Sequence, residues 1–104
     1  MQVTFRESRA FEKQATRLIG DESLWALQNE LATNPEKGPV IPGGRGLRKV
    51  RWAASGRGKR GGTRVIYYHW VTESLVDLVY VYAKNEMSDL TRKQAAQLAD
   101  ALGL

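Results

Sequence analysis

The chain of 104 residues has no cysteine and only one histidine. The lack of cysteine excludes disulfide bonds, thiolate zinc sites and cysteine nucleophiles. No uninterrupted apolar run approaches the roughly 20 residues that a membrane-spanning helix needs, and residues 1–9 lack the apolar core of a signal peptide. The sequence therefore predicts a cytoplasmic protein that does not insert into a membrane.

Acidic residues are absent from position 37 to position 72. The same stretch is strongly basic, since eight of the sixteen lysines and arginines lie between Arg45 and Arg64. Like charges packed together are unfavourable unless a counter-charge is near, and a nucleic-acid backbone supplies one. The net charge of +5 indicates the same kind of partner. The alternative is a solvated basic hairpin that serves solubility.

The length is typical of one domain, so residues 1–104 are expected to form a single domain. The apolar share of 42% and the charged share of 26% are ordinary for a soluble globular protein. The segment 36–46 contains two prolines and four glycines, which predicts a loop.

Apolar periodicity predicts seven elements along the chain. Strands are expected over 2–6, 47–53, 63–71 and 75–82, and helices over 9–19, 22–33 and 92–102, with caps at Ser8, Asp21 and Thr91. Trp25 is expected to enter the core beside the leucines of the second helix. Three consecutive late strands favour an antiparallel meander. The predicted fold is therefore α+β, with an N-terminal helical hairpin packed on a mainly antiparallel sheet and a short C-terminal helix.

The strand over 47–53 presents two cations side by side. Side chains alternate across a strand, so Lys49 and Arg51 share one face while Arg48 lies on the other. The glycine-rich basic loop that follows is not a P-loop, because it opens a strand and lacks the glycine-lysine-serine ending. His69 lies mid-strand without an acidic cluster in sequence, which indicates a packed or hydrogen-bonded histidine. No metal and no cofactor are expected.

Cations with neighbouring tyrosines can cleave RNA without a metal, because RNA carries its own nucleophile, the 2′-hydroxyl. The enzyme must align that hydroxyl, neutralise charge on the phosphorus and move two protons. Arginine suits the second task, and a lysine can act as a base when neighbouring cations depress its pKa. Lys49 beside Arg51 fits this scheme in principle. Simple RNA binding explains the composition equally well.

Three segments carry a resemblance to a known family. These are GLRKVRW (46–52), GKRGGTRVIYY (58–68) and YAKNEMSDLT (82–91). In content, order and spacing they resemble HigB-type toxins of the RelE/ParE superfamily, from type II toxin–antitoxin systems. The resemblance implies a compact RelE-like fold and a ribosome-dependent endoribonuclease, an mRNA interferase that cuts mRNA in the ribosomal A site. It also implies two partners: the ribosome with its mRNA and rRNA, and a cognate HigA-like, DNA-binding antitoxin.

The resemblance also implies roles for individual residues. Lys49 falls on the RelE-like strand lysine with Arg51 as its companion, and Arg64 falls on the arginine that contacts the scissile phosphate. Asn85 stands where RelE has a second cation, and no tyrosine follows Tyr82 to match the C-terminal catalytic tyrosine of RelE. Lys84 falls in the basic segment after the last strand, and Tyr82, Lys84 and Glu86 are candidate substitutes for the missing proton-transfer group. The candidate catalytic set is therefore Lys49, Arg51, Arg64, Tyr82, Lys84 and Glu86. The candidate RNA-binding residues, chosen for their charge, are Arg45, Arg48, Arg57, Lys59 and Arg60.

Two other functions remain open at this point. The chain could be a non-enzymatic basic module that binds RNA or an acidic protein, or a ParE-like toxin that inhibits gyrase, because a fold does not fix a function. Tyr82 could likewise be an ordinary aromatic residue at the end of a strand.

Overall fold

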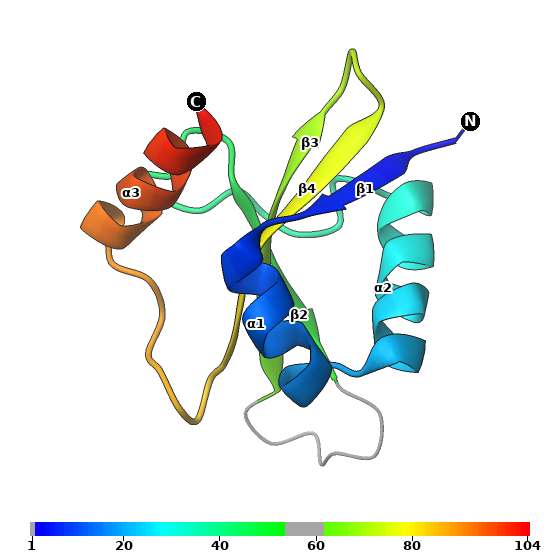
Figure 1. Cartoon of the computed structure of the whole chain (residues 1–104). Helices are drawn as coiled ribbons and strands as arrows, with labels where there is room; N and C mark the ends of the chain where they lie inside the picture. Colours follow the sequence, from blue (N-terminus) through cyan, green and yellow to red (C-terminus); the bar gives the residue numbers. More distant parts are fainter. Residues whose placement is uncertain (1, 54–61) are drawn as a thin grey trace.

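The computed structural model describes residues 2–53 and 62–104 and contains the predicted elements in the predicted order (Figure 1). They are β1 (Thr4–Glu7), α1 (Arg9–Leu18), α2 (Asp21–Thr33), β2 (Arg48–Trp52), β3 (Thr63–Trp70), β4 (Leu75–Ala83) and α3 (Arg92–Leu102). The predicted α+β class is confirmed.

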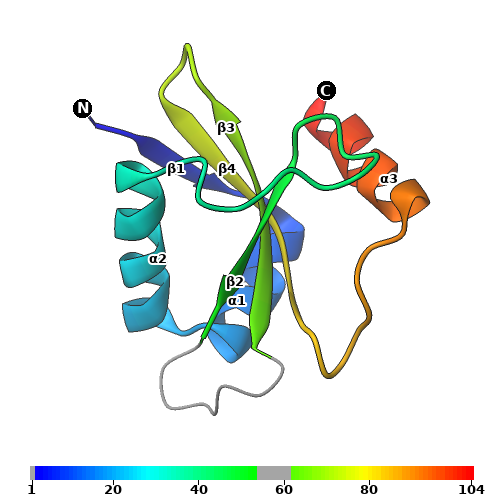
Figure 2. The ribbon, with the colours of Figure 1, turned by 180° about the vertical axis from the view of Figure 1, so that it is seen from behind.

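The four strands form one mixed sheet in the order β1-β4-β3-β2. The last three strands make the expected antiparallel meander, and β1 pairs with β4 in parallel. Seen from behind, β2 runs along the edge of the sheet beside β3 (Figure 2). The first strand can join in parallel because the α1–α2 hairpin carries the chain across one face of the sheet before β2 begins.

Two of the three predicted N-terminal capping residues are confirmed. Ser8 accepts a hydrogen bond from the backbone N–H of Phe11 at 3.0 Å, and Thr91 and Gln94 form the predicted capping box. The expectation that Asp21 caps α2 is wrong. Gly20 occupies that position with φ +85°, a conformation that favours glycine, and Asp21 lies in the first helical turn. Its carboxylate there still complements the positive end of the helix.

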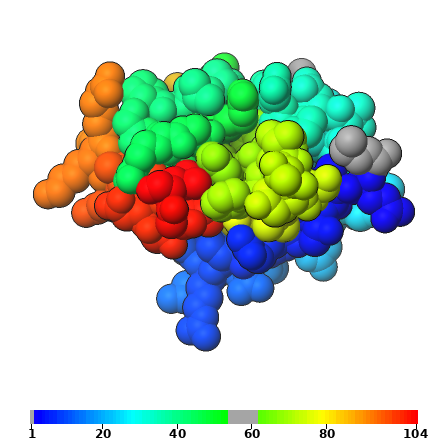
Figure 3. Space-filling view, turned by 90° about the horizontal axis from the view of Figure 1, so that it is seen from above, coloured from blue at the N-terminus to red at the C-terminus, as the bar shows by residue number. Residues whose placement is uncertain are grey.

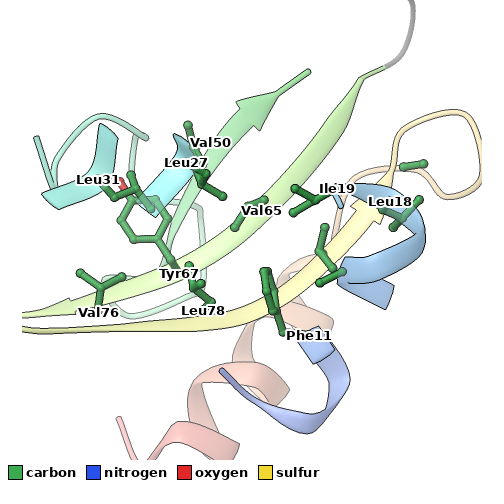
Figure 4. Packing of buried hydrophobic residues seen from close by; sticks show 13 residues of the cluster. Phe11, Leu18, Ile19, Leu27, Leu31, Val50, Val65, Tyr67, Val76 and Leu78 are labelled. Carbon is green, nitrogen blue, oxygen red and sulfur yellow. The ribbon is translucent and has the colours of Figure 1, made fainter. Parts of the chain in front are cut away.

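The main core lies between the sheet and the helices α1 and α2 (Figure 4). Phe11 from α1 and Leu27 and Leu31 from α2 pack with the inward residues Val65 and Tyr67 of β3, and all five are 0% exposed. Burying large apolar side chains is the dominant favourable term in folding. This face of the sheet is therefore filled by the main core. A second cluster of buried residues lies on the other face, where Ile66, Val79 and Tyr82 pack with Ala99 of α3.

The expectation that Trp25 belongs to the core is wrong, because 68% of its surface is exposed. A helix turns by roughly 100° per residue. This places Trp25 nearly opposite the buried stripe that contains Ser23, Leu27 and Leu31. Trp52 of β2 contributes to this core instead, and its Nε1–H donates to the Ser23 hydroxyl at 2.8 Å.

A polar network ties β1 to the centre of the sheet. Arg6 donates to both carboxylate oxygens of Asp77 at 2.6 and 2.7 Å, and Trp70 Nε1–H donates to the same carboxylate at 2.7 Å. Burial opposes ionisation of Asp77, but the hydrogen bonds from Arg6 and Trp70 and the Arg6 charge outweigh it and lower the pKa of Asp77 below 3.8.

A carboxylate whose pKa is lowered by folding stabilises the protein above its unfolded pKa and loses that contribution as the pH falls through its folded pKa. We therefore expect Asp77→Asn to lower the free energy of unfolding by about 1.5–3 kcal/mol at pH 7, because the network loses a charged acceptor. The difference from wild type should shrink as the pH falls below 3.8. Urea denaturation at pH 7 and pH 3 measures both effects. Glu73→Gln, in the exposed β3–β4 turn, is the control, and an equal destabilisation at both pH values would contradict the prediction.

Candidate functional site

The strand register places three candidate residues in one row across the sheet. Arg51 of β2 lies opposite Arg64 of β3, which lies opposite Tyr82 of β4. Lys49, two residues before Arg51, belongs to the next row and lies opposite Ile66. Because alternate residues share a face, all four candidate side chains lie on the side away from α1 and α2. The sheet thus brings together the candidates that the sequence places on separate strands.

Arg64 is the most enclosed cation of this group, with only 4% of its surface exposed, while Arg51 is open to solvent. Gly62 makes room for its guanidinium, since a Cβ at position 62 would lie 3.3 Å from Arg64 Nη1. Gly62 also has φ +60°, and its carbonyl accepts a hydrogen bond from the Lys84 N–H at 3.2 Å. The glycine before β3 therefore serves two purposes, a backbone turn and close approach of a charged side chain.

Asp89 supplies an acidic group that the sequence analysis missed. Its Oδ1 lies 3.3 Å from Lys49 Nζ and accepts a hydrogen bond from the Tyr82 hydroxyl at 3.1 Å. It belongs to the segment between β4 and α3, which brings it to the face that carries Lys49 and Tyr82. The hydrogen bonds from Lys49 and Tyr82, followed by the Lys49 charge, lower the pKa of Asp89. The carboxylate is therefore ionised at neutral pH.

A pocket of about 320 Å³ opens next to these three groups. Apolar and charged residues both line it, a combination typical of small-ligand sites. Its lining residues are Ile41, Pro42, Lys49, Ile66, Tyr82, Asp89, Leu90 and Arg92. Arg51 and Arg64 lie one row further along the same face.

Tyr82 is buried at 4% exposure. Burial first, and then the charge and hydrogen bond of Asp89, raise the pKa of Tyr82 to about 12, although the positive charge of Arg64 opposes the shift. The phenol therefore keeps its proton at neutral pH and can serve as a proton donor. It cannot serve as a resting base.

The other two catalytic candidates, Lys84 and Glu86, do not line this pocket, although Glu86 and Tyr82 border a second cavity. Glu86 accepts hydrogen bonds from Arg17 of α1 at 2.9 and 3.0 Å, so its carboxylate already has a cationic partner. Lys84 is exposed just beyond the end of β4. The structure thus brings Lys49, Arg51, Arg64 and Tyr82 together on one face of the sheet, and Lys84 and Glu86 belong to the segment that follows β4.

The RNA-binding candidates Arg45 and Arg48 have partners within the chain. The Arg45 guanidinium donates to the carbonyls of Leu104 at 2.8 Å and Ala96 at 2.9 Å and pairs with Asp100. The view from above shows the end of the chain lying beside the segment that contains Arg45 (Figure 3). Arg48 donates to the Gly38 carbonyl at 2.8 Å, on the other face from Lys49. Arg57, Lys59 and Arg60 lie outside the described residues.

Within residues 2–53 and 62–104, no three metal-ligating side chains of histidine, cysteine or acidic residues gather in one place. His69 is half-buried on β3. In this part of the chain, no helix has the length and apolar character needed to cross a membrane.

The raised pKa of Tyr82 leads to a direct prediction. At pH 10, where an ordinary phenol is half ionised, the Tyr82 ring should remain protonated. Asp89→Asn should increase its ionised fraction, because the Asp89 charge contributes to the raised pKa. Carbon-detected NMR of labelled tyrosine, assigned with Tyr82→Phe, measures the fraction, and Glu73→Gln serves as a control for general effects of charge. A Tyr82 resonance half shifted at pH 10 in the wild type would refute this description of the site.

Comparison with known proteins places the chain in a family. The family model described as the RelE toxin of the RelE/RelB toxin–antitoxin system matches residues 3–102. A free E. coli RelE toxin with two arginine-to-alanine substitutions shares the fold, with a TM-score of 0.65 and 15% identity over 100% of both chains. A chain of the intact E. coli RelBE toxin–antitoxin complex matches with a TM-score of 0.54 and 17% identity, over 79% of this chain and 96% of that chain. These likenesses confirm the RelE-like fold, and the match across nearly the whole sequence shows that the protein belongs to the RelE family of toxins from toxin–antitoxin systems.

Proposed function

We propose that this RelE-family toxin is a ribosome-dependent mRNA endonuclease of the HigB type, which inhibits translation by cutting mRNA in the ribosomal A site. The observation that carries the proposal is the cross-strand row Arg51–Arg64–Tyr82 with Lys49 beside it. Three cations and a protonated phenol on one face match the needs of phosphodiester cleavage by an internal 2′-hydroxyl.

The exposed and the buried cations have different roles in the proposed reaction. Arg51 and Lys49 are accessible enough to bind the phosphate as it arrives, since Arg51 is exposed and the Lys49 side chain is 26% exposed. Arg64 is buried, so its charge is fixed in place in a region of low dielectric constant. Charges that are already oriented there stabilise a transition state most effectively, because they need no reorganisation during the reaction.

Tyr82 provides the proton that the leaving 5′-oxygen needs. Its pKa of about 12 keeps it protonated, and an alkoxide leaving group is a strong enough base to take that proton. Lys84, exposed at the rim, is suited to contact a neighbouring phosphate. Glu86 is left out of this scheme because Arg17 already holds its carboxylate.

The remaining basic residues serve docking. Arg57, Lys59 and Arg60 belong to the glycine-rich segment between β2 and β3, and we assign them to rRNA on the grounds of charge. Arg45 and Arg48 have a structural role first, because their guanidinium groups fix the C-terminal end and the segment before β2. The protein partner is a cognate HigA-like, DNA-binding antitoxin, and its proposal is supported by the family match and by the fold shared with a chain of the RelBE complex.

Arg64→Ala should reduce the single-turnover cleavage rate on mRNA-programmed ribosomes by a factor on the order of 10²–10³, because a fixed transition-state charge is lost. Arg64→Lys keeps a charge at the buried position and should lose less. Gel-resolved cleavage of labelled mRNA measures the rate. Arg9→Ala, an exposed arginine at the start of α1, is the matched control and should cleave at the wild-type rate. Wild-type cleavage by a folded Arg64→Ala protein would remove Arg64 from the mechanism.

Cleavage by the 2′-hydroxyl needs no catalytic metal, because Arg51 and Arg64 can neutralise the phosphate. The upstream fragment should then end in a 2′,3′-cyclic phosphate and the downstream fragment in a 5′-hydroxyl. Chemical analysis of the ends tests this. Replacing magnesium by cobalt hexammine, which supports RNA structure without inner-sphere coordination, should leave the rate nearly unchanged. A 3′-hydroxyl with a 5′-phosphate, or activity lost only in cobalt hexammine, would indicate metal-dependent hydrolysis.

A further inference from the structure

The proposed reaction needs a group that takes the proton of the 2′-hydroxyl, and the cations around the pocket are not suited to that role. The guanidinium groups of Arg51 and Arg64 remain charged at any physiological pH. Tyr82 holds its proton up to a pKa of about 12, and Lys49 Nζ forms an ion pair with Asp89 Oδ1 at 3.3 Å. Of the described side chains in this cluster, the Asp89 carboxylate is the group that is unprotonated at neutral pH.

Asp89 is also placed where a reacting hydroxyl could reach it. Its side chain is 59% exposed and forms part of the pocket wall together with Lys49 and Tyr82. Among the described residues both of its contacts use Oδ1, the oxygen near Lys49 Nζ and the Tyr82 hydroxyl. The second oxygen, Oδ2, can therefore accept a hydrogen bond from RNA while the first stays anchored.

We propose that Asp89 is the general base that takes the proton from the 2′-hydroxyl, an assignment that rests on the proposed RNA cleavage. The 2′-oxygen gives its proton to the Asp89 carboxylate and forms a bond to phosphorus, and the bond from phosphorus to the 5′-oxygen breaks. The leaving 5′-oxygen takes the proton of the Tyr82 hydroxyl. The protonated Asp89 then returns a proton to the Tyr82 phenolate across their hydrogen bond. Protons balance, and both residues end in their starting states.

The substrate itself makes Asp89 a better base. In the free protein the charged or titratable groups that face it are Lys49, Arg64, Tyr82 and, across the pocket, Arg92. Of these, the cations hold the carboxylate in its ionised form and so weaken its attraction for a proton. A bound phosphate offsets the same positive charges, which restores proton affinity at the moment when the hydroxyl arrives.

The substitution Asp89→Asn separates a base from a merely structural residue. Asparagine has nearly the same size and keeps an oxygen that accepts from Lys49 and Tyr82, but it cannot take up a proton at neutral pH. We expect the single-turnover rate on saturated, mRNA-programmed ribosomes to fall by a factor on the order of 10²–10⁴. Ribosome binding should remain close to wild type. The control is Glu73→Gln, which removes a carboxylate at the far end of the β3–β4 hairpin.

A modified mRNA distinguishes the base from the acid. In a substrate with sulfur in place of the bridging 5′-oxygen at the cleavage site, the leaving thiolate needs no proton, because thiols are far more acidic than alcohols. This substrate should restore the rate of Tyr82→Phe and leave Asp89→Asn slow. Restoration of both variants would show that Asp89 acts only through Tyr82 and would overturn the assignment.

A second pair of variants tests the same assignment if Asp89→Asn does not fold. Asp89→Glu and Asp89→Gln have the same length, and the glutamate keeps a carboxylate that can accept a proton whereas the neutral amide does not, so the glutamate variant should cleave at least about tenfold faster. Equal rates would overturn the assignment, as would wild-type cleavage by Asp89→Asn. Both results require that the wild type cuts the mRNA. If the wild type does not cut, the proposed function itself is wrong.

Discussion

The structure depends on the pairing of β2, β3 and β4 in a single register. This pairing puts Arg64 between Arg51 and Tyr82 on one face of the sheet while its neighbours Val65 and Tyr67 enter the core on the other. Burying a guanidinium is unfavourable unless the surroundings compensate for lost water. The apolar face built from α1 and α2 supplies the stability that allows such a group to be held in place on the opposite face.

On the face of the sheet that carries Lys49, Arg51, Arg64 and Tyr82, positive charges lie close to a negative one. Among the described residues, Lys49, Arg51 and Arg64 lie together there, and Asp89, an acid from a different part of the chain, lies 3.3 Å from Lys49. Its carboxylate contacts Lys49, the lysine to which we assign phosphate binding. The positive charge of this face is thus partly neutralised in the free protein, and in our proposal a bound phosphate neutralises the rest. In the proposed mechanism, this arrangement links the binding of phosphate to the reactivity of the carboxylate.

Much of the fold and part of the site follow from local sequence patterns. Alternation within a strand is enough to pair Lys49 with Arg51, and the capping box identifies the start of α3. The same local patterns give the wrong position for Trp25, because its angle around the helix axis places it away from the buried leucines. They also give the wrong cap for α2, because Gly20, with its positive φ, occupies the capping position expected for Asp21. Local patterns also do not predict that Arg45 hydrogen-bonds to backbone carbonyls in and just after α3.

The position of Asp89 could not be predicted because it depends on how the segment between β4 and α3 folds back over the sheet. A search for acids near the basic residues in sequence finds none from position 37 to position 72. In space, however, Asp89 lies 3.3 Å from Lys49. A useful signal would have been its place inside the third family-like segment, where it was the only acid besides Glu86.

The most direct test of the account is to induce the toxin in cells and map the 5′ ends of mRNA against ribosome positions, with and without the cognate antitoxin. The account predicts new ends within A-site codons of translated messages, which appear on induction and disappear when the antitoxin is present. Growth arrest without new mRNA ends would contradict it, and a simultaneous loss of gyrase supercoiling would identify the protein as a gyrase inhibitor instead.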